Sequence, residues 1–363
     1  MKVGILTFQY SMNYGAQLQC YALKEFLKQH GHEVKVINLQ FKEESPYRGL
    51  GWKKSFFQAS KNAFYKFRYY KKLRRNINNF RCRYLNLTEP CNINTIGIIA
   101  NDFDAIVFGS DQIWGPSFHD SKVFFGKWMP PYKGIKISYS PCCAINKVAE
   151  SNVNELTLLL NSFNKISVRN LETQNFVYRL IQKYPPITLD PTLLYEFNEF
   201  KCHRLSPKYI LTYIIGKEIE GGHDIIIKKI KETFGNIPVY SIILTSQTQQ
   251  TYSWMDKTFW DVDPIEWMQL IQNSSFLYTD SFHGLIFALK LNVPALAYYS
   301  EAKRASRFID LANRYKMNEI IVSSVNDAIE RNCIKKTINY QLIRESINPY
   351  KSFSEEFLLN SLK

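Results

Sequence analysis

The sequence predicts an α/β protein of two domains, each built on a doubly wound parallel sheet, with the two sheets facing a shared cleft. The chain of 363 residues is too long for one ordinary core and suits two domains. Its composition, 45% hydrophobic and 21% charged, is typical of a globular protein. Short apolar segments alternate with helical segments in both halves, which is the pattern of parallel strands joined by crossover helices.

The first half opens with a strand, a helix that Gly31 ends, and a second strand, which together form a βαβ unit. Two apolar segments further along predict buried strands, and SKVFFGKW lies between them. The predicted strands are 2–8, 32–39, 103–110, 134–143 and 165–170, and the predicted helices are 16–31, 153–164 and 171–184.

A proline-containing stretch, PPITLDPTLL, separates the halves and predicts a domain boundary near residue 187. A second alternation then follows, with strands at 209–216, 237–245, 275–280 and 293–299 and helices at 221–235, 264–274 and 284–292. The tail, 324–332 and 339–363, is predicted to be helical. We therefore expect Rossmann-like domains at 1–186 and 187–363, the first with a basic helical excursion at 53–84 and the second with a helical tail.

The net charge of +14 is concentrated in that excursion. Between Lys53 and Tyr84 there are eleven Lys and Arg residues and no Asp or Glu, so the rest of the chain carries only +3. Aromatic and aliphatic residues recur there at three- and four-residue steps, which predicts an amphipathic helix. Either the helix is a solvated element docked on the first domain, or it has an electrostatic role toward an anionic inner leaflet or a diphosphate-linked carrier. Nucleic acid is disfavoured because no nucleic-acid-binding motif accompanies the charge.

Cysteine usage and the N-terminus indicate a cytoplasmic protein. The seven cysteines are odd in number and show no CxxC pair, which disfavours a disulfide framework and a zinc site. MKVGILTF lacks the features of a signal peptide, and no run of 18 apolar residues occurs. We expect a cytoplasmic location, with peripheral association at the inner face of the plasma membrane if the basic helix binds lipid.

Four loops follow predicted strands and should meet at the cleft, where open α/β sheets bind ligands. In the first, Gly15 at a helix start lets backbone amides approach an anion, and Asn13 precedes it; a plain tight turn is the alternative. In the second, Asp111, Gln112 and Trp114 suit a sugar, as hydroxyl acceptor, orienting amide and stacking face. An Asp-Gln turn that caps a helix is the alternative there.

The third and fourth loops supply a guanidinium and an imidazole. Arg169, between a short strand and a helix, suits bidentate contact with a phosphate or carboxylate, or an ordinary salt bridge. Ser281 and His283 lie between a strand and a helix, where Ser281 can cap the helix. His283 is the one histidine placed at such a junction, and it is either functional or a satisfied core residue.

The ordered segments NYGAQLQCYAL, FDAIVFGSDQIW, SVRN, LDPTLL and YTDSFHG resemble the polysaccharide pyruvyl transferase family over roughly residues 1–315. The resemblance implies a GT-B-like enzyme that moves a pyruvyl group from phosphoenolpyruvate onto two sugar hydroxyls as a ketal. Its acceptors are surface glycans, such as exopolysaccharides, or their lipid-linked precursors. It implies that Arg169 and His283 meet phosphoenolpyruvate and that Asp111 belongs to the family's GSD segment. No cofactor beyond the donor substrate is expected.

We assign His283 as acid or phosphate-site donor, Arg169 as anion clamp and Asp111 as acceptor-side base or hydroxyl orienter. Some family members carry an arginine shortly before the histidine, where this chain has Ser281-Phe282, and Arg304 or Arg307 is expected to replace that charge. A sugar-nucleotide glycosyltransferase is the alternative function, followed by a non-catalytic glycan-binding protein. The DFD and DVD triplets resemble metal-binding motifs only superficially, and no metal is expected.

Overall fold

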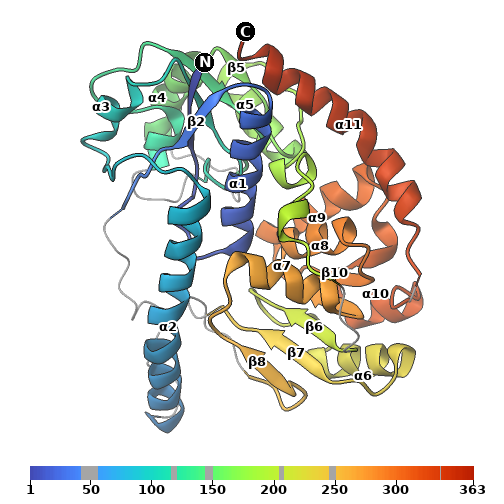
Figure 1. Ribbon diagram of the computed structural model, residues 1–363. Coiled ribbons are helices and arrows are strands. Elements are labelled where there is room, and N and C mark those ends of the chain that lie inside the picture. The colour runs from blue at the N-terminus through green and yellow to red at the C-terminus, as the bar shows by residue number, and fades with distance from the viewer. Residues whose placement is uncertain (42–55, 116–120, 144–149, 204–207, 245–250, 336) are drawn as a thin grey trace.

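Two parallel β-sheets organise the chain, as the sequence predicts (Figure 1). The computed structural model describes residues 1–41, 56–115, 121–143, 150–203, 208–244, 251–335 and 337–363, without the side chains of 56–67, 121 and 302–304. We call the first sheet and its helices the first unit, and the second sheet and its helices the second unit.

The first sheet has the strand order β2-β1-β3-β4-β5, and all its strand pairs are parallel. Its strands are β1 (Lys2–Leu6), β2 (Glu33–Val36), β3 (Ala105–Phe108), β4 (Ile135–Ser138) and β5 (Lys165–Ile166). The helices that precede the second sheet are α1 (Tyr14–Gln29), α2 (Phe56–Tyr84), α3 (Ile96–Ala100), α4 (Glu150–Asn161) and α5 (Leu171–Ile181), with a 3₁₀ turn η1 (Ser121–Phe125).

The second sheet has the order β11-β10-β9-β6-β7-β8 and is also parallel. Its strands are β6 (Ile210–Tyr213), β7 (Val239–Ile242), β8 (Lys257–Phe259), β9 (Phe276–Thr279), β10 (Ala295–Tyr298) and β11 (Ile321–Val322). The helices are α6 (His223–Phe234), α7 (Pro264–Asn273), α8 (Phe282–Lys290), α9 (Ala302–Arg314), α10 (Val325–Glu330) and α11 (Tyr340–Asn360). The 3₁₀ turns η2 (Pro191–Leu193) and η3 (Asn198–Phe200) lie between the sheets, and η4 (Asn318–Ile320) precedes β11.

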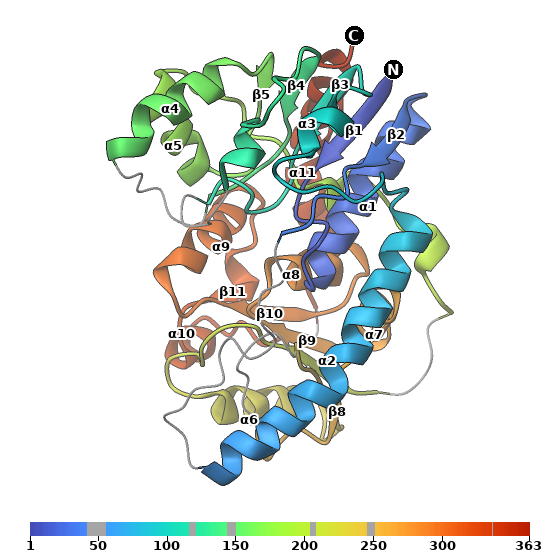
Figure 2. The ribbon, with the colours of Figure 1, turned by 90° about the vertical axis from the view of Figure 1, so that its left-hand side faces the viewer.

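The connection between the sheets stays close to the first unit before it enters the second. Thr188 N donates to Val168 O at 2.8 Å, next to β5, and the second sheet begins only at Ile210. The predicted domain boundary near 187 falls inside this connection and stays a prediction. The final helix, α11, then runs back to the first unit, and the two chain ends lie near each other (Figures 1 and 2). Ser354 of α11 accepts a hydrogen bond from Leu189 N at 2.9 Å.

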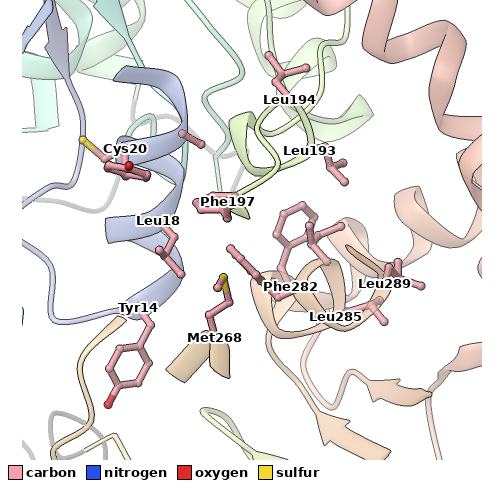
Figure 3. Close-up of a cluster of buried hydrophobic side chains, with 14 of the residues drawn as sticks. Tyr14, Leu18, Cys20, Leu193, Leu194, Phe197, Met268, Phe282, Leu285 and Leu289 are labelled. Carbon is pink, nitrogen blue, oxygen red and sulfur yellow. The ribbon is translucent and has the colours of Figure 1, made fainter. Parts of the chain in front are cut away.

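Among the described residues, one apolar cluster joins the two units. Tyr14 and Leu18 of α1 pack beside Met268 of α7, Phe282 of α8 and Phe197 of the connection (Figure 3). The ring of Tyr14 stacks on Trp267 with centroids 5.8 Å apart. Because α1 belongs to the first unit and α7 and α8 to the second, this packing fixes the starts of α1 and α8 against each other.

The basic helix predicted at 53–84 is confirmed as α2 from residue 56, whereas residues 53–55 lie outside the described part. Its buried apolar residues, Leu73, Ile77 and Phe80, follow the predicted stripe. None of the described helices is apolar over enough of its length to cross a bilayer.

Candidate functional site

A buried carboxylate, that of Asp190, lies where the two units meet. It is the N-cap of η2, and its Oδ1 accepts hydrogen bonds from Thr192 N at 3.0 Å and Thr192 Oγ1 at 2.7 Å. Its Oδ2 is 2.7 Å from Arg169 Nη1 and 3.3 Å from His283 Nε2. Asp190 therefore joins a guanidinium of the first unit to an imidazole of the second.

Arg169 follows β5 and is nearly fully buried. Its Nη2 lies 3.6 Å from Asp111 Oδ1, and its guanidinium carbon lies 4.6 Å from the centre of the Phe282 ring. Nη2 also points to Cys142 Sγ, 2.7 Å away. The guanidinium is thus fixed by two acids and an aromatic face, which restrains its orientation more firmly than a single ion pair does.

His283 occupies the first turn of α8, where Ser281 is the N-cap and accepts a hydrogen bond from Gly284 N at 3.2 Å. The imidazole lies directly against α1. A Cβ atom added to Gly15 would fall 2.2 Å from His283 Nδ1, a distance that no side chain tolerates. Gly15 is therefore required for this close approach, a role that differs from the expected approach of a backbone amide to an anion.

The loop after β3 brings Asp111 and Gln112 to the same place. Asp111 has φ = +74°, a left-handed conformation that costs a non-glycine residue energy and is concentrated at functional sites. The amide group of Gln112 is oriented with its oxygen toward α9. In this orientation the oxygen accepts hydrogen bonds from the guanidinium of Arg307, and the bond from Nη2 is 3.1 Å long. Since α9 belongs to the second unit, this contact is another bridge between the units.

A small hollow borders the buried pair. Its lining includes the guanidinium-bearing residues Arg169, Arg307 and Arg314 and the acids Asp190 and Asp310. Arg314 donates to the Arg169 carbonyl oxygen at 2.9 Å and to Asp310 Oδ2, with its Nε at 3.0 Å from that oxygen. Three arginines and two acids line the hollow, so the local charge is net positive.

Charges at the centre are strongly coupled. Burial opposes ionisation of Asp190, but the neighbouring His283 and Arg169 outweigh it and hold the pKa of this carboxyl well below its usual range. Burial raises the pKa of the Cys142 thiol, so it is neutral near pH 7. The site therefore contains an ionised carboxylate and its cations, with no activated thiolate at Cys142.

The remaining predicted site residues lie in different settings. Asn13 caps α1 by accepting from Gly15 N at 2.9 Å and Ala16 N at 3.3 Å. Trp114 is fully buried, donates from Nε1 to Phe124 O at 3.0 Å and stacks on Phe125, so its ring has no exposed face for a sugar. The backbone of Arg304 lies in the first turn of α9, but its side chain is outside the described part of the chain.

The predicted group of Asp111, Arg169 and His283 is brought together, but through two residues that sequence reasoning missed. Asp190 stands in the segment LDPTLL, which we interpret from the sequence only as part of a domain boundary and of the family resemblance, and Arg314 lies fifteen residues after the predicted strand 293–299. The signal for Asp190 was an acid flanked by two apolar stretches at the domain boundary. Among the described residues, no three His, Cys, Asp or Glu side chains gather as a metal site.

Comparisons with known proteins address the family and the fold. A family model for polysaccharide pyruvyl transferase matches residues 13–301. A search of curated proteins gives no match. HepE of Anabaena, in a structure with UDP and glucose, is similar with 10% identity and a TM-score of 0.58, covering 100% of this chain and 99% of that chain.

A second similar structure is a UDP-N-acetylglucosamine 2-epimerase from Listeria monocytogenes, described as putative. It has 10% identity and a TM-score of 0.53 and covers 99% of this chain and 94% of that chain. At such low identity both likenesses bear on the fold alone. They show that the two-sheet architecture is GT-B-like, as the sequence predicts.

Proposed function

The chain belongs to the polysaccharide pyruvyl transferase family, and on that premise we propose that it transfers a pyruvyl group from phosphoenolpyruvate to a sugar. The acceptor is a sugar of a cell-surface polysaccharide or of its lipid-linked precursor, and two of its hydroxyls become a cyclic ketal. The reaction takes place in the cytoplasm or at the inner face of the plasma membrane. The observation that carries the proposal is the junction of Arg169 and His283, from different units, beside an arginine-lined hollow.

The reaction requires one proton gained by carbon and two lost by hydroxyls. Protonation of the methylene carbon of phosphoenolpyruvate gives a methyl group and an oxocarbenium-like C2, which the first hydroxyl attacks. The C2–O bond to phosphate breaks, and the second hydroxyl attacks C2 and closes the ketal. One hydroxyl proton balances the proton taken up by carbon, and the other leaves with the released hydrogen phosphate.

The geometry fixes the orientation of the imidazole of His283, the residue that we propose as the acid. An ionised Asp190 at 3.3 Å requires a hydrogen on Nε2, because two acceptors do not form a hydrogen bond. Asp190 also orients the imidazole, in the way a buried carboxylate orients the histidine of a catalytic triad. We assign Asp190 as a positioning residue that holds both the imidazole and the guanidinium.

Two arginines have different roles toward the negative charge of the donor. Arg169 is committed to Asp190 and Asp111, so it stabilises negative charge from a fixed, buried position. Arg307 is only half-buried and borders the same hollow, and we assign it to the phosphate of the donor. That assignment supplies the cation that this chain lacks before His283. Asp111, also half-buried, is left as the base or orienting group for an acceptor hydroxyl.

Ligand-induced thermal stabilisation of the purified protein tests the donor. A ligand at about one hundred times its Kd stabilises by about 2.7 kcal/mol, so phosphoenolpyruvate is expected to raise the Tm measurably. Arg307→Ala and His283→Gln are expected to remove most of that rise. The control, Arg179→Ala, removes an exposed arginine of α5 and is expected to keep it. Arg169→Ala is a weaker test, because it removes a cation from the buried charge of Asp190 and thereby also destabilises the fold.

Transfer itself is tested by incubating the enzyme with phosphoenolpyruvate and a glycan acceptor. Phosphate release in equal amount to a pyruvyl ketal detected by mass spectrometry is the expected result. Stabilisation by a sugar nucleotide alone would assign the chain to glycosyl transfer. Stabilisation by neither ligand, in a protein that melts cooperatively, would overturn the proposal.

A further inference from the structure

Helix α2 has two faces of different chemistry over residues 68–84. Leu73, Ile77 and Phe80 are at most 3% exposed, and Phe80 lies 6.1 Å from Tyr21 and 6.2 Å from Phe200, measured between ring centres. The opposite face is exposed along its whole length, and we call it the basic face: Arg68, Lys71, Lys72, Arg75, Asn79 and Arg83. Spacings of three, four and seven residues put these side chains on one side of the helix.

The helix is firmly attached to both units, so the basic face has a fixed direction. Asn76 Nδ2 donates to Asp261 O at 2.5 Å, and Tyr69 stacks on Trp260 with ring centres 5.7 Å apart, both in the second unit. Near its other end, Arg81 Nε donates to Gln9 Oε1 at 3.1 Å, in the loop that follows β1. These contacts leave the basic face turned to solvent.

The N-terminal part of α2 projects beyond the rest of the molecule. Figures 1 and 2 show its first turns extending past β8, away from both sheets. The sequence from 53 to 84 contains eleven Lys and Arg residues and no acid, so positive charge continues along the projecting part. Lys72 is paired with Asp261 at 2.5 Å yet remains 55% exposed.

We propose that the basic face docks the protein on an anionic lipid bilayer. Arg68 and Arg83 are about 22 Å apart along a straight helix, so the face presents a row of cations to a flat surface. Each cation near such a surface is attracted to anionic lipids within a Debye length, about 8 Å at physiological salt. The proposal goes beyond pyruvyl transfer and does not rest on it, although docking would bring a lipid-linked acceptor within reach.

Vesicle co-sedimentation of the full chain tests the proposal. Phosphatidylglycerol vesicles are expected to bind the protein, phosphatidylcholine vesicles to leave it in solution, and 0.5 M salt to release it. The triple variant Arg68→Glu, Lys71→Glu and Arg75→Glu is expected to lose about 100-fold in affinity, because each cation contributes about fivefold. The control reverses three other exposed cations, Lys133, Lys165 and Lys183, and changes the net charge equally.

Equal losses in the triple variant and its control would show attraction by net charge alone and would overturn the proposal. So would wild-type protein that ignores anionic vesicles, including protein that instead binds duplex DNA. Phosphoenolpyruvate-induced stabilisation of the triple variant, which keeps the whole candidate site, is expected to equal that of the wild type. Failure of docking is thereby separated from failure of the proposed reaction.

Discussion

Asp190 carries a negative charge in a place from which solvent is excluded. Such a charge is tolerated only because Arg169, His283 and Thr192 surround both of its oxygens. The same contacts that stabilise the carboxylate also orient the guanidinium and the imidazole. At the scale of single residues, the stability of the fold and the chemistry of the site therefore depend on the same hydrogen bonds.

Asp190→Asn is expected to destabilise the protein by about 3 kcal/mol at pH 7, because it leaves the buried cation Arg169 undercompensated. The pKa of Asp190 is lowered in the folded state, so its contribution is present above the unfolded pKa, about 3.9, and is lost as pH falls through the folded value. Urea unfolding at pH 7 and at pH 3 measures this. The wild type should lose more stability than the variant between these pH values, and equal losses would contradict the assignment.

At the scale of elements, the site depends on two helix starts that touch. Helix α1 begins at Tyr14, helix α8 begins at Phe282, and Gly15 lies against His283 between them. Asn13 and Ser281 cap the two helices with side-chain oxygens, so the polar loop residues fix the helix ends rather than reach for ligand in this structure.

A double-mutant cycle tests that contact. Gly15→Ala is expected to cost about 1–3 kcal/mol, because the added methyl group displaces the imidazole or α1. In a His283→Ala background the same change should cost close to nothing, since the clashing ring is gone. Equal costs in both backgrounds, measured by chemical unfolding, would place the strain elsewhere.

Long, periodic elements could be predicted from the sequence, but two of the short strands could not. The strong patterns at 16–31, 221–235 and 264–274 correspond to α1, α6 and α7. The strands β8 and β11, of three and two residues, are too short to show alternation. Helix α9 was not predicted, although its buried residues Phe308, Leu311 and Ala312 recur at helical spacing.

At the scale of the whole molecule, the sequence predicts which loops lie close together, but it does not predict which side chains pair with one another. Parallel strands bring their carboxyl ends to one edge, which is why loops of the first and second units could be expected to meet. That Arg169 would pair with Asp190, rather than stand open to ligand, depends on the path of the connection between the sheets. The burial of Trp114 likewise depends on the path of the chain, because its loop packs against η1.

The shared apolar cluster predicts cooperative unfolding. Residues of β1 and of β6 belong to one buried cluster, so neither unit retains its full core alone. Chemical unfolding followed by circular dichroism and by tryptophan fluorescence is expected to give one coincident transition. Two transitions, or different midpoints for the two probes, would show that the units unfold independently.

Helix α11 leaves the second unit and ends beside the first, where Ser354 holds the backbone at Leu189. These contacts join segments more than 160 residues apart in the sequence. We therefore expect that the first unit of a nascent chain lacks its packing against α11 until that helix has been made. Helix α11 thus completes the packing of a segment that is made 165 residues earlier. A ribosome-stalled chain that lacks α11 should accordingly be cut readily by protease near the connection.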